Sequence, residues 1–438
     1  MHLPPRSKTI ASIAVMTAAV LTLSACSKSE TTAGNAPATS APVSASDTAM
    51  SSDTSSSSAS DTGSGSDTGS ASSSDTGSAS SSDTGSASSS DTGSASSSDT
   101  GSASSSDTAS SSSTSESGSG GGGTQVVQSG DQGATCTIAQ YGLKPFDLKA
   151  GSVGFSQSEK EDNPFRIAET QSIKDEAQKL GLKLETTNAQ TDLNKQISDI
   201  QDLLNKGVKL LIVAPLNSDG LEPAFAAAKD KGVPIITIDR KVNMPACAQY
   251  VSFLGSNFTQ QGKRAATAMI KATGGKGKIA ILLGAAGNNV TDERTKGFVD
   301  EVKASAPGLQ IVAQQSGEFA RDKGQQVAEQ LIQAHPDLTG MYAENDEMGI
   351  GAVNALEAAG KKPGTEVKMV SIDGTKNAVK LIVDGKYNAV IESNPRFGPL
   401  AFKTAMDFVS GKPVGQNVVI SDSEYDSSNA KQKVNDAY

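Results

Sequence analysis

Hydrophobic and polar positions follow a regular order from Gly151 onward, and that order predicts strands and helices in turn. In the first half we expect strands at 153–155, 182–187, 210–215 and 234–239, and helices at 167–180, 193–204 and 221–231. The apolar runs Leu210-Leu-Ile-Val213 and Ile235-Ile-Thr-Ile238 are continuous rather than alternating, as in strands that are covered on both faces. The pattern therefore predicts a parallel sheet with right-handed crossovers.

A second series of the same kind begins in the middle of the chain, after a strand at 250–255 and a helix at 258–272. Its strands are expected at 279–283, 309–312, 340–343, 369–372 and 389–391, and its helices at 290–304, 323–334, 349–359, 378–384 and 398–410. Roughly 300 residues exceed what one core usually supports. We therefore expect an α/β protein with two doubly wound parallel-sheet lobes whose strand ends face a shared cleft. Lobe 1 covers about 150–255 plus a C-terminal segment, and lobe 2 covers about 258–392.

The first residues predict export. Arg6 and Lys8 precede an apolar run from Ile10 to Ala25, which has the layout of a secretory signal peptide at 1–25. The run is too short for a comfortable membrane span. Cys26 directly follows Leu-Ser-Ala, an arrangement that resembles the lipobox of bacterial lipoproteins and implies that Cys26 is lipidated. An ordinary signal peptide with an incidental Cys is the alternative.

Residues 26–135 have the composition of a tether. They are mostly Ser, Asp, Thr, Gly and Ala, and the unit Ser-Asp-Thr-Gly-Ser-Ala-Ser-Ser recurs every eight residues. Such a segment buries too little apolar surface to offset its ordering entropy, so we expect disorder up to Thr135. The net charge of −10 also resides here, because the tether holds ten Asp, two Glu and one Lys. The remaining head, 136–438, is nearly neutral and has no obvious basic patch, which argues against a nucleic-acid partner.

The Cys and His content limits the chemistry of the head. Besides Cys26 there are two cysteines, Cys136 and Cys247, which are a disulfide candidate in an oxidising compartment. Two separate buried thiols are the alternative, because the sequence gives no distance between them. The head has one His, His335, which excludes a multi-His metal site and argues against a Ser/His/Asp triad. We expect no metal and no cofactor.

Polar residues cluster where the predicted strands end, at Asp239-Arg240, Glu344-Asn345-Asp346 and Asp373-Gly374. In a doubly wound sheet these positions open onto the cleft. An ionised Asp accepts hydrogen bonds from two vicinal hydroxyls, and Arg donates through a rigid fork, so the set suits a neutral polyol. A residue of this kind, taken singly, is more often a helix cap or a member of a surface pair than a ligand contact.

Several short segments make the resemblance to a known family specific. They are Asn163-Pro-Phe-Arg166, Ile238-Asp-Arg240, Glu293-Arg-Thr-Lys-Gly-Phe298, Tyr342-Ala-Glu-Asn-Asp-Glu-Met348 and Ser371-Ile-Asp-Gly374. With them, nearly the whole head resembles the ribose- and galactose-type periplasmic solute-binding proteins of ABC importers. Gly154-Phe-Ser-Gln157 and Ser316-Gly-Glu-Phe-Ala-Arg321 look closer to the galactofuranose-binding branch. The resemblance implies the type I periplasmic binding protein fold, with two lobes joined by a three-strand hinge.

The resemblance also implies roles for ten residues of this chain as ligand contacts. The first lobe would contribute Asn163, Phe165, Arg166, Asp239 and Arg240, and the second Arg294, Phe319, Asn345 and Asp373, with Ser393 near the hinge. Arg166 stands where ribose binders place a second Phe, which puts ribose itself in doubt. Ser393 matches a Gln of the ribose binders, so its contact is uncertain. Core packing is the alternative for both Phe residues.

The function implied is the capture of a monosaccharide, galactofuranose-like or another pentose or hexose, for delivery to an ABC permease and its ATPase. The protein would be a monomer held to the outer face of the cell membrane by the lipid on Cys26. A membrane-tethered sugar sensor that presents its ligand to a signalling receptor is an alternative. A glycosidase that uses Asp239 and Asp373 is disfavoured, because Arg240 and Arg294 would keep both carboxylates ionised and leave no general acid. We therefore expect a protein that is not an enzyme.

Overall fold

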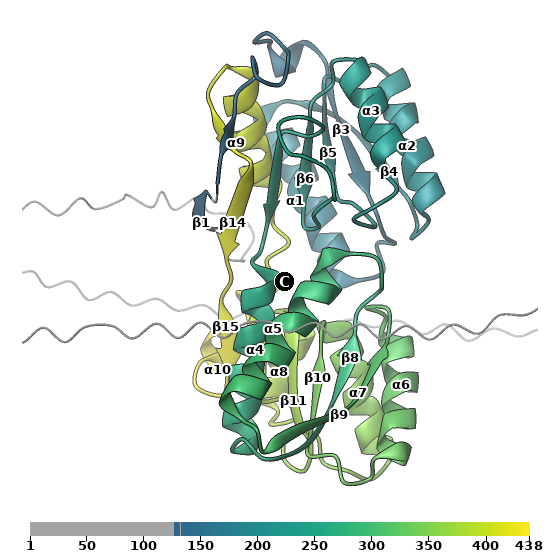
Figure 1. Cartoon of the computed structure of the whole chain (residues 1–438), viewed down its shortest axis with the longest axis vertical. Helices are drawn as coiled ribbons and strands as arrows, with labels where there is room; N and C mark the ends of the chain where they lie inside the picture. The colour runs from purple at the N-terminus through teal and green to yellow at the C-terminus, as the bar shows by residue number, and fades with distance from the viewer. Residues whose placement is uncertain (1–126, 132) are drawn as a thin grey trace, which may run out of the picture. The chain divides into compact units, whose positions relative to one another are not determined.

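The computed structural model describes residues 127–131 and 133–438, which form two α/β lobes (Figure 1). The signal peptide at 1–25, Cys26 and the tether up to residue 126 lie outside the described residues. Within the described part, no helix is both long and apolar enough to cross a membrane.

Lobe 1 is built on a seven-stranded sheet in the order β1-β14-β7-β6-β5-β3-β4, parallel except for β1. Its strands are β1 (Val127–Asp131), β3 (Ser152–Gln157), β4 (Lys183–Asn188), β5 (Leu210–Val213), β6 (Ile235–Ile238), β7 (Ser252–Gly255) and β14 (Asn417–Ser421). Its helices are α1 (Pro164–Leu180), α2 (Leu193–Asn205), α3 (Glu222–Asp230) and α9 (Gly398–Val409), with a 3-10 turn at Leu148–Ala150. Every residue of β5 and β6 is buried, as their continuous apolar runs predict.

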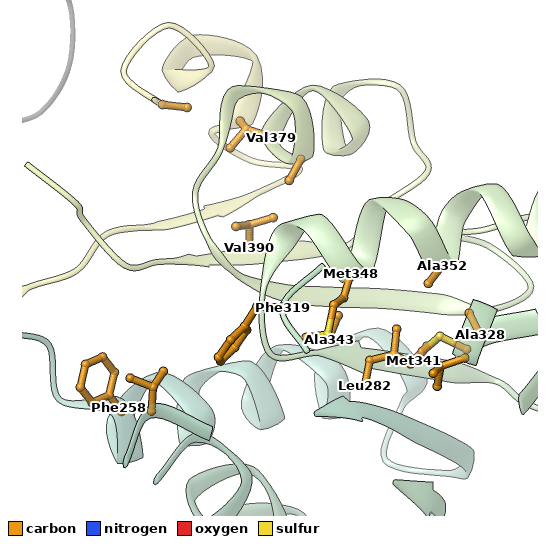
Figure 2. Close-up of a cluster of buried hydrophobic side chains, with 14 of the residues drawn as sticks. Phe258, Leu282, Phe319, Ala328, Met341, Ala343, Met348, Ala352, Val379 and Val390 are labelled. Atoms are coloured by element: carbon orange, nitrogen blue, oxygen red, sulfur yellow. The ribbon is translucent and has the colours of Figure 1, made fainter. Parts of the chain in front are cut away.

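Lobe 2 is built on a six-stranded sheet in the order β15-β12-β11-β10-β8-β9, in which only β15 is antiparallel to its neighbour. Its strands are β8 (Gly277–Leu283), β9 (Leu309–Ser316), β10 (Gly340–Ala343), β11 (Lys368–Asp373), β12 (Ala389–Glu392) and β15 (Glu424–Asp426). Its helices are α4 (Phe258–Thr273), α5 (Asn289–Ser305), α6 (Arg321–Ala334), α7 (Asp346–Ala358), α8 (Lys376–Val383) and α10 (Ala430–Lys433). Figure 2 shows part of the lobe 2 core, where Leu282, Met341 and Ala343 of the sheet share one cluster with Ala328, Met348 and Ala352 of the helices.

Close packing of α4 on α5 fixes the position of Arg294. A Cβ added to Gly262 of α4 would lie 2.1 Å from the carbonyl oxygen of Arg294, and one on Gly297 would lie 2.1 Å from that of Thr259. Since neither helix could approach so closely with a side chain at these positions, the two glycines bring the helix that carries Arg294 against α4.

The chain passes between the lobes three times, between β7 and α4, between β12 and α9, and between β14 and β15. Asp422 in the third segment accepts hydrogen bonds from Ser256 in the first, at 3.0 Å, and from Gln261 at the start of α4, at 2.9 Å. The expected architecture of two doubly wound lobes joined by a three-segment hinge is therefore confirmed.

The end of the chain is divided between the lobes, although the sequence assigned the whole C-terminal segment to lobe 1. α9 and β14 do join lobe 1, but β15 pairs with β12 and α10 packs against α8 in lobe 2. Short elements after the last long helix carry too few apolar positions to show which sheet they extend.

The expected tether extends too far along the chain. β1 pairs antiparallel with β14, and β2 (Thr135–Cys136) pairs with β13 (Val414–Gly415). These strands are held by backbone hydrogen bonds, which a Ser- and Gly-rich composition does not exclude. Pairing also covers the outer edge of β14, whose backbone groups need partners.

The structure joins Cys136 and Cys247 in a disulfide bond across 111 positions of sequence. Cys136 lies on β2 and is fully buried, and Cys247 lies in the loop between β6 and β7. The bond fastens the start of the head to lobe 1.

Candidate functional site

A cavity at the carboxyl ends of strands from both sheets brings together nine of the ten expected ligand contacts. It contains about 330 Å³ of empty space, including its mouth. Its lining residues are Glu159, Asn163, Phe165, Arg166, Asp239 and Arg240 from lobe 1, and Val290, Arg294, Phe319, Asn345 and Asp373 from lobe 2. We call it the inner cavity.

In lobe 1, Arg166 is held by three carboxylates. It contacts Glu159, Glu169 and Asp239 through N···O distances of 2.8 Å each, and all four side chains are largely buried. A buried guanidinium is costly unless it is paired, and these carboxylates fix the head group of Arg166. Burial, opposed in part by the charge of Arg166, raises the pKa of Glu169.

Glu159 also binds Arg240, with 2.6 Å between Oε1 and NH2. Burial raises the pKa of Glu159, but the charges of Arg240 and Arg166 and their hydrogen bonds outweigh burial and lower it to about 2. Arg240 donates a second bond from NH1 to the carbonyl oxygen of Leu216, at 2.8 Å. Its Nε is buried and has no hydrogen-bond partner. Asp239 uses Oδ2 for its contacts with both arginines. The Arg240 contact is made by Nε at 3.8 Å, which is beyond hydrogen-bond distance, so Nε still lacks a hydrogen-bond partner.

In lobe 2, Arg294 donates from Nε to Gln261, at 2.9 Å, and from NH1 to the carbonyl oxygen of Glu344, at 2.5 Å. Its NH1 lies 3.9 Å from Oδ1 of Asp373. Asn345 caps α7 by accepting from the Met348 N–H and donates to the carbonyl oxygen of Phe319, at 3.0 Å each. The helix-cap interpretation is thus correct for Asn345, and the same side chain also lines the inner cavity.

Burial works against the ionisation of Asp373. It raises the pKa of Asp373 above its ordinary value; the charge of Arg294 lowers the pKa in part, and Asp346 raises it further. Arg294 therefore opposes the effect of burial on this carboxyl without cancelling it.

Three of the seven non-glycine residues with positive φ in the described part of the chain line the inner cavity. Asp239, Phe319 and Asp373 have φ values of 64°, 60° and 144°, which residues other than Gly rarely adopt. Asp239 and Asp373 stand at the ends of β6 and β11, where a sharp change of direction turns their side chains into the cleft. Such strain persists only where the surrounding structure enforces it, and it is typical of functional positions.

Both Phe residues line the inner cavity and also pack into the hydrophobic core. Phe165 belongs to a lobe 1 cluster and meets the Tyr438 ring edge-on, with 6.2 Å between centroids. Phe319 belongs to the cluster of Figure 2. A Cβ on Gly284 would lie 2.0 Å from the Phe319 ring, so that glycine is required for the ring to lie where it does. The two interpretations of these residues are compatible.

Glu159 and Val290 line the inner cavity without having been predicted, Ser393 was predicted but does not line it, and Asn163 has a second role. Glu159 was missed because it stands in the charged run Ser-Glu-Lys-Glu-Asp, which has the appearance of a solvated loop. Asn163 lines the inner cavity but also caps α1, accepting from the Phe165 N–H at 2.9 Å. Ser393 is absent from the cavity lining; it lies in the second hinge segment, where its N–H donates to the carbonyl oxygen of Asp373 and its own carbonyl accepts from Tyr438. No signal in the sequence identified Val290.

The lobes also contact each other directly on one side of the cleft. The Ser218 N–H donates to the carbonyl oxygen of Gly287 at 2.9 Å, and the Asn289 N–H donates to the Ser218 hydroxyl at 3.1 Å. The Lys241 N–H donates to Oδ1 of Asn289 at 2.9 Å. We call these four residues the latch. With the latch formed and the cavity residues buried, the cleft is closed.

A two-lobed α/β protein with a closed cleft of arginines, carboxylates and flanking aromatic rings has the features of a solute-binding protein. The chain belongs to the periplasmic binding protein family, because the periplasmic binding protein domain matches residues 153–413. The resemblance recognised in the sequence is therefore confirmed.

Similar proteins within the family include sugar-binding proteins. The ribose import binding protein RbsB of Bacillus subtilis is 35% identical over 258 residues, which cover 59% of this chain and 81% of that protein. The galactofuranose-binding protein YtfQ of Escherichia coli is 34% identical over 255 residues, which cover 57% of this chain and 80% of that protein. The crystal structure of a galactofuranose binding protein, 32% identical, matches with a TM-score of 0.62 over 65% of this chain and 97% of its own.

Proposed function

We propose that this protein captures a monosaccharide between its lobes and delivers it to an ABC importer. The observation that supports this most is a buried donor without a hydrogen-bond partner, Nε of Arg240, on a cavity wall that also contains the carboxylate of Asp239. A sugar hydroxyl both donates and accepts, so it fits such a pair. Relatives named for import and for sugar binding support the same role, and they favour delivery to an importer over the alternative of a sensor.

The proposed ligand is galactofuranose or a sugar of similar shape. Arg166 takes the position of an aromatic ring in ribose binders, and its ion pairs with three carboxylates hold it there. A cavity wall made of a guanidinium and carboxylates selects for hydroxyls rather than for an apolar ring face. The galactofuranose-binding relatives support this choice.

In the proposed mechanism the sugar stabilises the closed state. Asp239 and Arg240 bind it from lobe 1, and Arg294 and Asp373 bind it from lobe 2. A ligand that satisfies both sets has a higher affinity for the closed form than for the open form, so it shifts the equilibrium toward closure. An importer that recognises only the closed form then receives loaded protein.

Two further parts of the proposal concern location and catalysis. Lipidation of Cys26 would hold the protein at the outer face of the membrane, next to the permease. The protein would bind without chemical turnover, in keeping with relatives that are named as binding proteins. Labelled galactofuranosides incubated with the protein should be recovered intact, and released sugar would contradict this part.

Calorimetry of the full chain with D-galactose, D-ribose, L-arabinose, D-fructose and myo-inositol tests the proposed function. We expect micromolar or tighter binding of at least one sugar. Small-angle scattering should show a smaller radius of gyration when that sugar is added. If none of the five binds at millimolar concentration, the proposed function is wrong for this ligand class.

A further inference from the structure

A second, larger cavity adjoins the inner one. It contains about 1630 Å³ of empty space, including the part that is open to solvent. Glu159, Asn163 and Phe319 line both cavities, so the two are neighbours. Beyond them its lining includes Lys160 of lobe 1 and Lys323 of lobe 2. We call it the outer cavity.

The outer cavity lies where the two lobes do not meet. Its flanks are the loop 158–164 after β3 and the loop 317–323 before and at the start of α6. Among the residues that the structure describes, no hydrogen bond or ion pair joins these two loops. The latch, in contrast, joins the lobes through Ser218 and Asn289. The lobes are therefore in contact at the latch and remain apart between 158–164 and 317–323. We call the opening between these two loops the window.

The chemistry of the window favours a neutral, hydroxyl-rich group. Acidic side chains outnumber basic ones, with Glu159, Asp162, Glu318, Asp322 and Glu347 against Lys160, Arg321 and Lys323. Arg321 and Glu347 pair with each other, at 2.8 and 2.9 Å, and Glu159 is paired with Arg166 and Arg240. The charged groups that remain are Asp162, Glu318 and Asp322 against Lys160 and Lys323. Carboxylates and ammonium groups together offer acceptors and donors to hydroxyls, so this lining suits a neutral, hydroxyl-rich group. Phe319 is the one aromatic side chain in this lining, so an apolar substituent has little to pack against.

We propose that the site accepts glycosides, in which one sugar ring occupies the inner cavity and a neutral, hydroxyl-rich substituent, such as a second sugar, extends through the window into the outer cavity. This inference rests on the proposed function and enlarges its ligand class from free monosaccharides to glycosylated ones. A fully enclosed cavity would reject any substituent by steric overlap. The window removes that restriction on one side only.

A disaccharide of two galactofuranose units linked from C1 to O6 tests the inference in both orientations. If its non-reducing unit binds in the inner cavity the substituent is on C1, and if its reducing unit binds there the substituent is on O6. Calorimetry with the full chain should give a dissociation constant within thirtyfold of that for D-galactose, after correction for the furanose fraction. A loss of thirtyfold or more overturns the inference.

The two ligands also separate this inference from the proposed function. Binding of D-galactose without the disaccharide leaves the proposed function standing and overturns the inference. Binding of the disaccharide alone supports the inference and removes the free monosaccharide as cargo. Binding of neither overturns both for galactofuranose.

Filling the window gives a second test. Lys323 is exposed and lines only the outer cavity, so Lys323→Trp should weaken disaccharide binding at least tenfold and leave D-galactose binding within threefold. Lys431→Trp on α10, also exposed, is the matched control and should change neither affinity. An equal loss for both ligands in Lys323→Trp, or no loss for either, overturns the inference.

Discussion

Replacement of Asp239 tests the inner cavity most directly. Its Oδ2 pairs with Arg166, and we propose that its Oδ1 accepts from a sugar hydroxyl. Asp239→Ala removes both the charge and the acceptor. Hydrogen bonds to charged groups contribute about 1.5 to 3 kcal/mol each, so we expect a loss of about 2 to 4 kcal/mol of binding free energy. That loss corresponds to a roughly 30-fold to 1,000-fold weaker affinity.

The backbone at Asp239 requires a second variant. Its φ of 64° is tolerated by Asp and Asn but costs an Ala residue about 1 kcal/mol or more. Asp239→Asn keeps the backbone preference and one acceptor oxygen, so it isolates the loss of charge and should weaken binding at the lower end of the same range. The fold should survive in both variants, because Arg166 keeps Glu159 and Glu169 as partners.

Calorimetry with the tightest-binding sugar of the panel measures the affinity, and thermal unfolding without ligand checks the fold. Asp407→Asn is the matched control, since Asp407 pairs with Lys403 and Lys412 on the surface of lobe 1. Its affinity should equal that of the wild type. If Asp239→Asn and Asp239→Ala both bind within threefold of the wild type, Asp239 is a structural residue and the pocket has been placed wrongly.

Deleting 27–126 should leave sugar affinity unchanged, because every residue that lines the inner cavity lies between 159 and 373; a tenfold loss would contradict this. Reducing the bond between Cys136 and Cys247 should lower the free energy of unfolding by about 4 to 5 kcal/mol, and equal urea midpoints with and without reductant would refute it. Asn289→Ala removes a latch bond worth about 1 kcal/mol, so sugar affinity should fall about fivefold, whereas an unchanged affinity would show that the latch does not favour closure. Burial raises the pKa of Glu344 from 4.5 to about 7. The unfolded chain therefore loses this proton at a lower pH than the folded protein does. Stability falls as the pH rises between those two values. Glu344→Gln should remove that contribution. If plots of unfolding temperature against pH run parallel for the wild type and the variant from pH 4.5 to 8, the assignment is wrong.

The long helices and strands could be predicted because their buried positions form a local pattern of apolar residues along the sequence. The buried strands β5 and β6 appear in the sequence as apolar runs. The edge strand β1 does not, because it is held by backbone pairing with β14 rather than by an apolar pattern. The same reason explains why β15 could not be assigned to lobe 2 from its sequence. The local pattern does not show which strands pair when they are far apart in the sequence.

The site was predictable in its residue types but not in its contacts. Family-like segments located Arg166, Asp239 and Asp373, yet nothing local indicates that Glu159 bridges Arg166 and Arg240. The balance of burial and charge at Asp373 could not be inferred from the sequence for a related reason. A neighbouring Arg can be inferred from a motif, but the degree of burial that opposes it depends on how both lobes close.

The carboxylates of lobe 1 contribute both to the stability of the fold and to ligand binding. Without partners, a buried Arg166 would be strongly destabilising, so Glu159, Glu169 and Asp239 are needed even when the cleft is empty. The same ion pairs hold the donors and acceptors in place before a sugar arrives, which reduces the ordering cost of binding. The groups that remain open, such as Nε of Arg240, are then few and fixed in direction. Selectivity follows, because a sugar that lacks the matching hydroxyl leaves a buried donor unpaired, and that costs more than the bond itself contributes.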